Sequence, residues 1–193
     1  GMPLHLYLNP VTVLPIVTGK GCYFNRCKFC DIPYINTIST KAYRVRGAEQ
    51  IAADVKRLHD LHGCRHFEIT DETLAPKLLL KMADALDAYP EIRPRFVGYA
   101  RFEPGFTPEV CRRIHAMGMR KLYFGLESGN QEMLDRMDKG IKVDVARHVL
   151  RNCVDAGIAV HVFSIVGFPE ESERQARDTL AFLVDEASTL DHP

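Results

Sequence analysis

The chain has 193 residues, enough for one sizeable hydrophobic core or a large part of one. Its formal net charge is zero and its charges are evenly mixed, so composition indicates neither a nucleic-acid-binding nor a membrane-surface protein. The longest apolar runs have the length of strands, and no signal peptide precedes the first motif, so we expect a cytoplasmic protein without a membrane span.

The start of the chain is expected to be a lead-in segment, residues 1–12, followed by one domain over residues 13–193. Gly1 before Met2 is typical of a cloning remnant, so we expect the ends to be boundaries of a piece of a longer protein. The first strand is predicted from Val13 to Thr18, where the sequence is continuously apolar.

Three cysteines follow this strand closely, at Cys22, Cys27 and Cys30. Three clustered thiolates suggest a metal site with one ligand missing. A structural zinc site normally has four protein ligands, whereas an iron-sulfur cluster held by three cysteines keeps one iron open. Two alternatives stay open: a disulfide with a spare thiol, or a zinc knuckle completed by a distant histidine. The isolated Cys64, Cys111 and Cys153 are predicted to be core residues.

The rest of the chain alternates strand-like and helix-like segments. Further strands are predicted at 66–70, 95–100, 121–126 and 159–166. Helices are predicted over 47–61 with Gly63 as stop, and between Pro76 and Pro90. Thr107, Asn130 and Asp144 are predicted to be N-caps of three helices that end at Gly118, Met137 and Gly157, and a Ser172–Gln175 capping box is predicted to start the last helix. The alternation predicts an α/β fold with parallel βα units.

In a parallel barrel, the residues just past the carboxyl ends of the strands form the active-site face. Besides the cysteine loop, these residues are predicted to be Thr70-Asp71-Glu72, Arg101 and Glu103, Glu127-Ser128, and Gly167-Phe168-Pro169-Glu170. Every strand end therefore carries a charged or ligating group.

Taken together, these residues resemble the radical S-adenosylmethionine (SAM) enzymes over nearly the whole chain. The resemblance implies a partial parallel (β/α) barrel, TIM-barrel-like, with five of the family's six βα units present. It also implies a 4Fe-4S cluster and S-adenosylmethionine as cofactors, with the open iron chelating the methionine part. Electron transfer then yields a 5′-deoxyadenosyl radical that acts on the substrate, here unknown, and the protein positions the cofactors. The expected partner is a reductant such as flavodoxin or ferredoxin.

The same resemblance assigns roles to individual positions. Cys22, Cys27 and Cys30 match the cluster ligands, which are also counted as the catalytic residues. The other positions implied to bind cofactor are Phe29, near adenine; Thr70, Asp71 and Glu72, for the methionine ammonium; Arg101; Glu127 and Ser128, for the ribose or methionine group; Lys139, for the carboxylate; and Val166 and Gly167, whose backbone contacts adenine.

Two features depart from the common family pattern. The usual spacing is Cys-x3-Cys-x2-Cys, but four residues separate Cys22 from Cys27, as in relatives that carry a cobalamin-binding domain. Cobalamin, bound through a domain absent from this chain, is therefore a further expected cofactor. The sixth strand is also missing, so the isolated piece is expected to be incomplete for turnover.

Two other classes of function compete with this interpretation. One is a non-catalytic zinc- or iron-binding scaffold module. The other is an ordinary acid-base barrel enzyme that uses Glu127, Asp71 and His66, with the cysteines incidental.

Overall fold

The computed structural model describes residues 4, 10–38 and 41–190 of the chain. Most of the expected lead-in, residues 1–3 and 5–9, lies outside the described residues. The elements of the fold are β1 (Val13–Ile16), β2 (Gly19–Lys20), α1 (Ile32–Thr37), β3 (Arg44–Val45), α2 (Ala48–His62), β4 (His66–Leu74), α3 (Pro76–Leu86), β5 (Arg95–Ala100), α4 (Pro108–Met117), β6 (Met119–Glu127), α5 (Gln131–Arg136), α6 (Val143–Asp155), β7 (Ala159–Ser164), α7 (Glu173–Asp185) and α8 (Ala187–Leu190).

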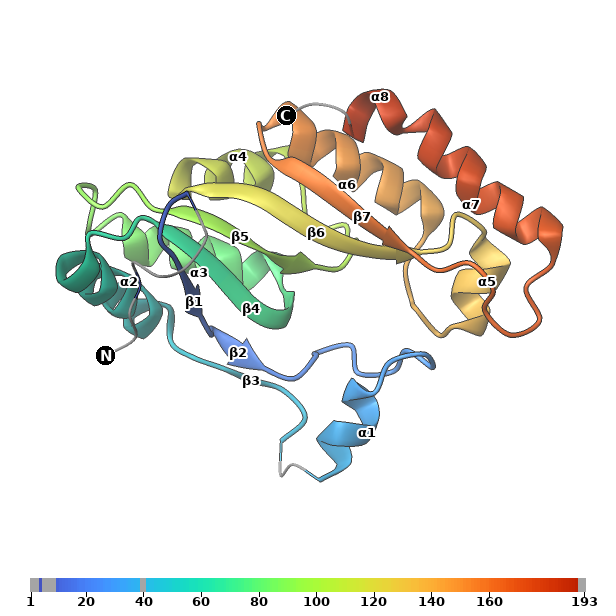
Figure 1. Cartoon of the computed structure of the whole chain (residues 1–193), viewed down its shortest axis with the longest axis horizontal. Coiled ribbons are helices and arrows are strands. Elements are labelled where there is room, and N and C mark those ends of the chain that lie inside the picture. Colours follow the sequence, from blue (N-terminus) through green and yellow to red (C-terminus); the bar gives the residue numbers. More distant parts are fainter. Residues whose placement is uncertain (1–3, 5–9, 39–40, 191–193) are drawn as a thin grey trace.

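A five-stranded parallel sheet, in the order β1-β4-β5-β6-β7, forms the centre of the molecule. The long helices lie along one side of this sheet, while β2, β3 and α1 extend away from it (Figure 1). The predicted partial barrel of βα units is confirmed. The antiparallel β2–β3 pair, α1 and α8 were not predicted, because segments of two to six residues carry too little sequence periodicity.

Alternation along the strands separates two faces of the sheet. One face packs against the helices and is fully buried, with Phe67 and Ile69 on β4 and Phe124 on β6. The opposite face is partly accessible and carries polar and aromatic side chains, including Tyr99 and Tyr123. This second face is the inner wall of the partial barrel.

Most predicted helix boundaries are confirmed by their caps. Gly63 ends α2 in the left-handed conformation, with φ 63°, and Thr107 accepts a hydrogen bond from the Val110 amide at the start of α4. Ser172 and Gln175 form the predicted capping box of α7.

Asp144 does not cap α6, so that prediction was wrong. Lys142 is the N-cap residue and makes no side-chain capping bond, while Asp144 lies in the first turn. A carboxylate stabilises the positive end of a helix both at the N-cap and in the first turn, so the sequence did not distinguish these two positions.

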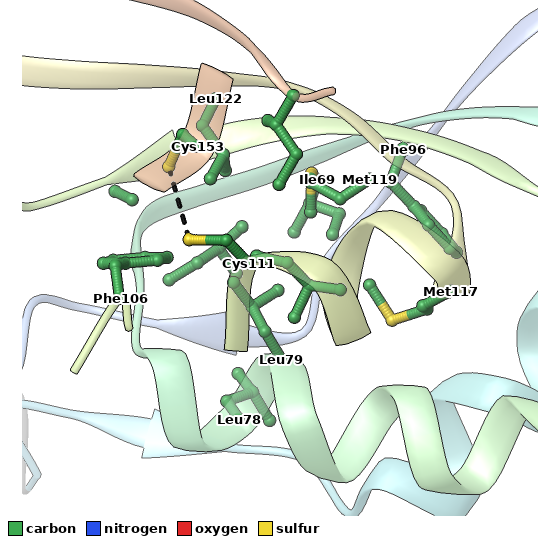
Figure 2. Packing of buried hydrophobic residues seen from close by; sticks show 14 of the residues in the cluster. Ile69, Leu78, Leu79, Phe96, Phe106, Cys111, Met117, Met119, Leu122 and Cys153 are labelled. Atoms are coloured by element: carbon green, nitrogen blue, oxygen red, sulfur yellow. Dashed lines mark hydrogen bonds between the residues drawn. The ribbon is translucent and has the colours of Figure 1, made fainter. Parts of the chain in front are cut away.

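The three isolated cysteines are buried, as predicted. Cys111 on α4 and Cys153 on α6 face one another with their sulfurs 3.7 Å apart, inside a cluster that includes Phe106, Leu79 and Leu122 (Figure 2). Their contact connects α4 to α6 within the helical layer, and neither cysteine belongs to the cysteine loop.

Among the described residues, no helix combines the length and the apolar character needed to cross a bilayer.

Candidate functional site

The cysteine loop lies between β2 and α1, next to the carboxyl ends of the strands. It begins at Gly21, with φ +85°, where a Cβ would lie 1.9 Å from the Ala42 carbonyl oxygen. Only glycine fits such a turn. The Gly21 amide donates to Glu72 Oε2 at 3.0 Å, which ties the loop to β4. Cys22, Cys27 and Cys30 are all free and partly accessible.

The cysteine loop is fastened to the segment that follows α5. The Lys28 amide donates to the Met137 carbonyl at 2.9 Å, and Arg26 pairs with Asp138 at 2.6 Å. The Phe24 ring packs on Gly140, where any Cβ would lie 2.4 Å from it. These contacts bring the cysteines next to residues more than a hundred positions later in the chain.

A cavity of about 220 Å³ opens between the cysteine loop and the inner face of the sheet. Eight of the residues predicted to form the site line it: Cys22, Cys27, Phe29, Cys30, Glu72, Arg101, Glu127 and Lys139. These eight come from the cysteine loop, from three different strand ends and from the segment after α5.

Lys139 and Glu127 form a buried ion pair in this cavity. Lys139 Nζ donates to Glu127 Oε1 at 2.7 Å, and their side chains are only 7% and 10% exposed. Glu127 has φ +67°, an uncommon conformation for a residue with a side chain, beside an irregularity in the β6–β7 pairing. The bend turns its carboxylate toward Lys139. A Cβ at Gly125 would lie 2.3 Å from Glu127 Oε1, so glycine there leaves space for the pair.

Arg101 follows β5 and is almost fully buried beside the cysteine loop. One guanidinium nitrogen lies 3.7 Å from Cys27 Sγ, and another donates to the Lys139 carbonyl at 2.5 Å. The guanidinium carbon lies 3.8 Å from the centre of the Phe24 ring, a cation-π contact. Its Nε has no hydrogen-bond partner among the described residues. Arg101 thus connects the cysteine loop, the sheet and Lys139.

The predicted trio after β4 takes a different position from the one expected. The strand continues to Leu74, with a shift of register after Ile69, so Thr70, Asp71 and Glu72 lie within it. Thr70 is exposed and does not line the cavity. Asp71 is buried and accepts two hydrogen bonds from Thr18, at 2.7 Å from its amide and 2.5 Å from its hydroxyl. Glu72 alone of the three lines the cavity.

Three more predicted residues lie outside the cavity lining. Ser128 is fully buried and shares a hydrogen bond of 3.0 Å with the Thr179 hydroxyl of α7. Val166 is 69% exposed. The Gly167 amide, in a residue with φ +89°, donates to Glu171 at 2.6 Å.

The cavity also has an aromatic wall that the sequence pattern did not reveal. Tyr99, Tyr123 and Phe163 line it from three neighbouring strands, with the rings of Tyr99 and Tyr123 stacked at 5.0 Å between centroids. Phe163 continues the stack 5.9 Å from Tyr123. All three lie inside predicted strands, a position that could have indicated the cavity wall. Aromatic residues inside strands are equally typical of a hydrophobic core, so the sequence did not distinguish the two.

The donor set fits an iron-sulfur cluster. Three free thiols share one cavity with two cationic side chains, and sulfur ligation with nearby positive charge is typical of such clusters. Burial raises the pKa of the Cys27 thiol, while Lys139 and Arg101 act in the opposite direction by favouring the thiolate. Among the described residues, no three His, Cys, Asp or Glu side chains converge on a single point, as a mononuclear metal site requires. A cluster does not need this, because each cysteine binds a different iron.

Comparison with known proteins agrees with the family resemblance of the sequence. The sequence model of the Radical SAM superfamily matches residues 16–183. An uncharacterized methyltransferase of Pyrococcus horikoshii is 24% identical over 172 residues, which are 86% of this chain and 36% of that protein. The bacteriochlorophyllide d C-12(1)-methyltransferase of Chlorobaculum tepidum is 24% identical over 89% of this chain and 37% of its own length. The chain therefore spans little more than a third of these relatives.

Solved structures share the fold. The radical S-adenosylmethionine methyltransferase TsrM of Kitasatospora setae superposes with a TM-score of 0.74 and 24% identity, over 93% of this chain and 34% of that chain. The cobalamin-dependent S-adenosylmethionine radical enzyme OxsB superposes with a TM-score of 0.71 and 21% identity, over 88% of this chain and 26% of that chain.

Proposed function

Because the chain belongs to the radical SAM superfamily, we propose that it is the core of a radical SAM enzyme that binds a 4Fe-4S cluster and S-adenosylmethionine. When bound, these cofactors supply reductive cleavage of S-adenosylmethionine to a 5′-deoxyadenosyl radical. The observation that carries the proposal is the shared cavity: Cys22, Cys27 and Cys30 line the same 220 Å³ as the buried Lys139–Glu127 pair.

Each charged side chain of the cavity has a chemically suitable part of the cofactor to bind. Lys139 has three N–H donors and uses one on Glu127, so it can also hold the methionine carboxylate. Glu127 keeps an oxygen free for an ammonium or a ribose hydroxyl. Glu72 is a better acceptor for the ammonium than Asp71, because it lines the cavity while both oxygens of Asp71 are occupied by Thr18.

Phe29 and Arg101 are proposed to complete the site. Phe29 is 37% exposed and lies over the ammonium of Lys139, at 5.4 Å, so its ring can cover an adenine from the solvent side. Arg101 holds the cysteine loop through Phe24 and faces Cys27, so its charge favours the thiolate. Ser128, Val166, Gly167, Thr70 and Asp71 are proposed to support the site without lining it.

We further propose that the parent protein transfers a methyl or methylthio group and uses cobalamin held by a domain outside this chain. Both relatives described above are named methyltransferases, and OxsB is named cobalamin-dependent. The four-residue gap between Cys22 and Cys27 supports the same assignment. A flavodoxin- or ferredoxin-type reductant is the proposed electron donor, and the cytoplasm the proposed compartment.

Anaerobic reconstitution with iron and sulfide tests the proposal. We expect about four irons per chain, as a 4Fe-4S cluster requires, an electron paramagnetic resonance signal on reduction, and a change in that signal when S-adenosylmethionine is added. Cys27→Ala should lose the signal, whereas Cys64→Ala, a buried thiol away from the cavity, should keep it. A colourless protein with stoichiometric zinc would instead identify the metal-binding scaffold. A cluster whose signal ignores S-adenosylmethionine would also overturn the proposal.

A further inference from the structure

A second hollow, of about 880 Å³, lies at the opposite ends of the strands from the cysteine loop. Four arginines line it, each placed where the chain enters the sheet: Arg65 directly before β4, Arg93 and Arg95 at the start of β5, and Arg120 near the start of β6. At about 3.3 Å per residue, the seven residues from Arg120 to Glu127 put this hollow roughly 20 Å from the ion pair of the cavity. It is therefore a separate place on the molecule.

These arginines differ from the others in their lack of carboxylate partners. Most arginines of the described part of the chain form an ion pair. The described arginines with no such partner are Arg44, Arg65, Arg93, Arg95 and Arg120, and four of these five line the hollow. Asp87 is the single carboxylate among the lining residues, and it pairs with Arg113 at 2.5 Å.

Helix dipoles account for only part of this cluster. The helices end near the starts of the strands, and their terminal carbonyls attract cations. Arg120 uses that attraction, since it donates to the His115 carbonyl of α4 at 2.7 Å. No side-chain hydrogen bond is formed by Arg65, Arg93 or Arg95 within the described residues. Burial and the neighbouring charge of Arg95 lower the pKa of Arg120, so the cations repel one another in the absence of an anion.

The backbone beneath the arginines is closely connected. The Arg95 amide donates to the Arg65 carbonyl at 2.6 Å, and the Phe96 amide donates to Gly118 at 2.9 Å. Gly118, with φ +121°, lies so close to Pro94 that a Cβ would be 2.0 Å from the Pro94 oxygen. The backbone positions of these arginines are therefore fixed, so that only the freedom of their side chains is lost when they bind a ligand.

We propose that this hollow binds a small ligand carrying two or more phosphate groups. A guanidinium fork donates two parallel hydrogen bonds to a phosphate, and the four positive charges around this hollow exceed the charge of about −2 that one phosphate group carries. The volume is within the range of small-molecule sites, roughly 300–1,000 Å³. The half-buried Tyr89, together with Pro90, supplies an apolar wall beside the arginines. This site does not depend on the proposed function of the cysteine cavity.

Calorimetric titration of the 193-residue chain with inorganic pyrophosphate and with ADP, at constant ionic strength, tests the site. We expect saturable binding of pyrophosphate that the double variant Arg65→Gln/Arg95→Gln weakens at least about 10-fold, the value of one charged hydrogen bond. The matched control Arg112→Gln/Arg177→Gln removes two exposed arginines from helix surfaces and should change the affinity less than about 2-fold, as expected for exposed pairs. If ADP binds more tightly than pyrophosphate, its base contacts the Tyr89 wall. If the two bind equally, the hollow recognises the phosphates alone. Both results support the proposal.

Three results would overturn it: no binding beyond that of matched chloride, equal weakening by the control variant, or binding of single-stranded RNA without binding of pyrophosphate. Thermal unfolding of each variant shows whether it is folded. If the double variant is not, Arg93→Gln replaces it, because that side chain is exposed and makes no bond among the described residues. An unchanged pyrophosphate affinity in folded Arg93→Gln and Arg95→Gln single variants would likewise exclude the site.

Discussion

Lys139 Nζ and Glu127 Oε1 lie 2.7 Å apart in the cavity beside the cysteines, although the two residues are twelve positions apart in the chain. The left-handed conformation of Glu127 and the glycine at position 125 make this contact possible. A buried ion pair facing a cavity is costly to maintain for stability alone, because both charges are taken out of water. We therefore expect the pair to serve ligand binding in the cavity.

Replacing Lys139 with alanine should weaken S-adenosylmethionine binding about 10- to 100-fold, the value of roughly one charged hydrogen bond. Iron content should stay unchanged, because Lys139 is no thiolate ligand. Anaerobic titration of the reconstituted protein measures the affinity. Lys142→Ala, which removes an exposed lysine three residues away, is the control. Equal affinities in both variants would remove Lys139 from the site.

The variant also leaves Glu127 buried without its partner, at a cost of about 3–5 kcal/mol in stability. The double variant Lys139→Met/Glu127→Gln removes both charges and should recover most of that loss. Urea unfolding of the two variants separates the effect on stability from the effect on binding.

Replacing Gly125 with alanine should displace the ion pair, because the new methyl group would lie 2.3 Å from Glu127 Oε1 and 2.8 Å from Lys139 Nζ. We expect S-adenosylmethionine binding to weaken at least about 10-fold, the value of one charged hydrogen bond, with the cluster retained. Gly47→Ala is the comparison, since the nearest atom to its added methyl group is 3.6 Å away. A Gly125→Ala protein that binds the cofactor normally would show that the pair can move without consequence.

Replacing Arg101 with glutamine should lower the reduction potential of the cluster. A cation 3.7 Å from Cys27 Sγ stabilises the more negative reduced state, so its removal favours the oxidised state. The expected shift is on the order of 60 mV, a tenfold change in a one-electron equilibrium. Redox titration followed by electron paramagnetic resonance measures it, with Arg112→Gln as control because Arg112 is 63% exposed on α4 and does not line the cavity. An unchanged potential would leave Arg101 with a packing role only.

Replacing Asp71 with asparagine should change how stability depends on pH. Burial raises the pKa of the Asp71 carboxyl above its ordinary 3.8, more than the bonds from Thr18 lower it. The folded protein then holds the proton more tightly than the unfolded chain. The contribution of Asp71 to stability is complete below pH 3.8 and is lost as the pH rises through its folded-state pKa.

An asparagine at this position cannot ionise, so the Asp71→Asn protein should be at least as stable as the parent at pH 7 and should lose this advantage toward about pH 3.5, below the ordinary pKa of the carboxyl. Urea unfolding at both pH values measures the difference, with Asp155→Asn at an exposed helix end as control. If the difference in stability between the two proteins is the same at both pH values, burial does not outweigh the hydrogen bonds in setting the pKa of Asp71.

Replacing Cys153 with alanine should cost about 1–2 kcal/mol of stability, because it removes one sulfur from a fully buried cluster. Chemical unfolding measures the loss.

In the native apoprotein, a thiol reagent should modify Cys22, Cys27 and Cys30 readily and leave Cys111 and Cys153 unmodified (Figure 2). Rapid labelling of Cys153 in the folded protein would contradict its burial.

The sequence predicted those parts of the fold that local chemistry determines. The β5 strand was predicted with its observed bounds, and Asn130 and Ser172 were recognised as helix caps, because apolar runs and capping residues act over a few neighbours. The extension of β4 to Leu74 was missed, since polar residues there are held by bonds to Thr18 and Gly21, far away in the chain.

The candidate site shows the same division. Sequence pattern selected the cysteines and Glu127, and the family resemblance selected Lys139. Neither predicted the contact between Glu127 and Lys139, which depends on the backbone turn at Glu127. Asp71 and Ser128 were also assigned to the site, and the bonds of their side chains to Thr18 and Thr179 were not predicted. The partner that a polar side chain bonds to is set by tertiary structure, and the sequence pattern alone does not contain this information.

The attachment of the cysteine loop to residues 137–140 sets an order of events during synthesis. Phe24, Arg26 and Lys28 leave the ribosome more than a hundred residues before their partners Gly140, Asp138 and Met137. Until those partners emerge and β6 joins the sheet, the three thiols belong to a loose segment. The three thiols therefore reach their folded surroundings only after residues 137–140 have been made, and we expect stable metal binding to follow that step.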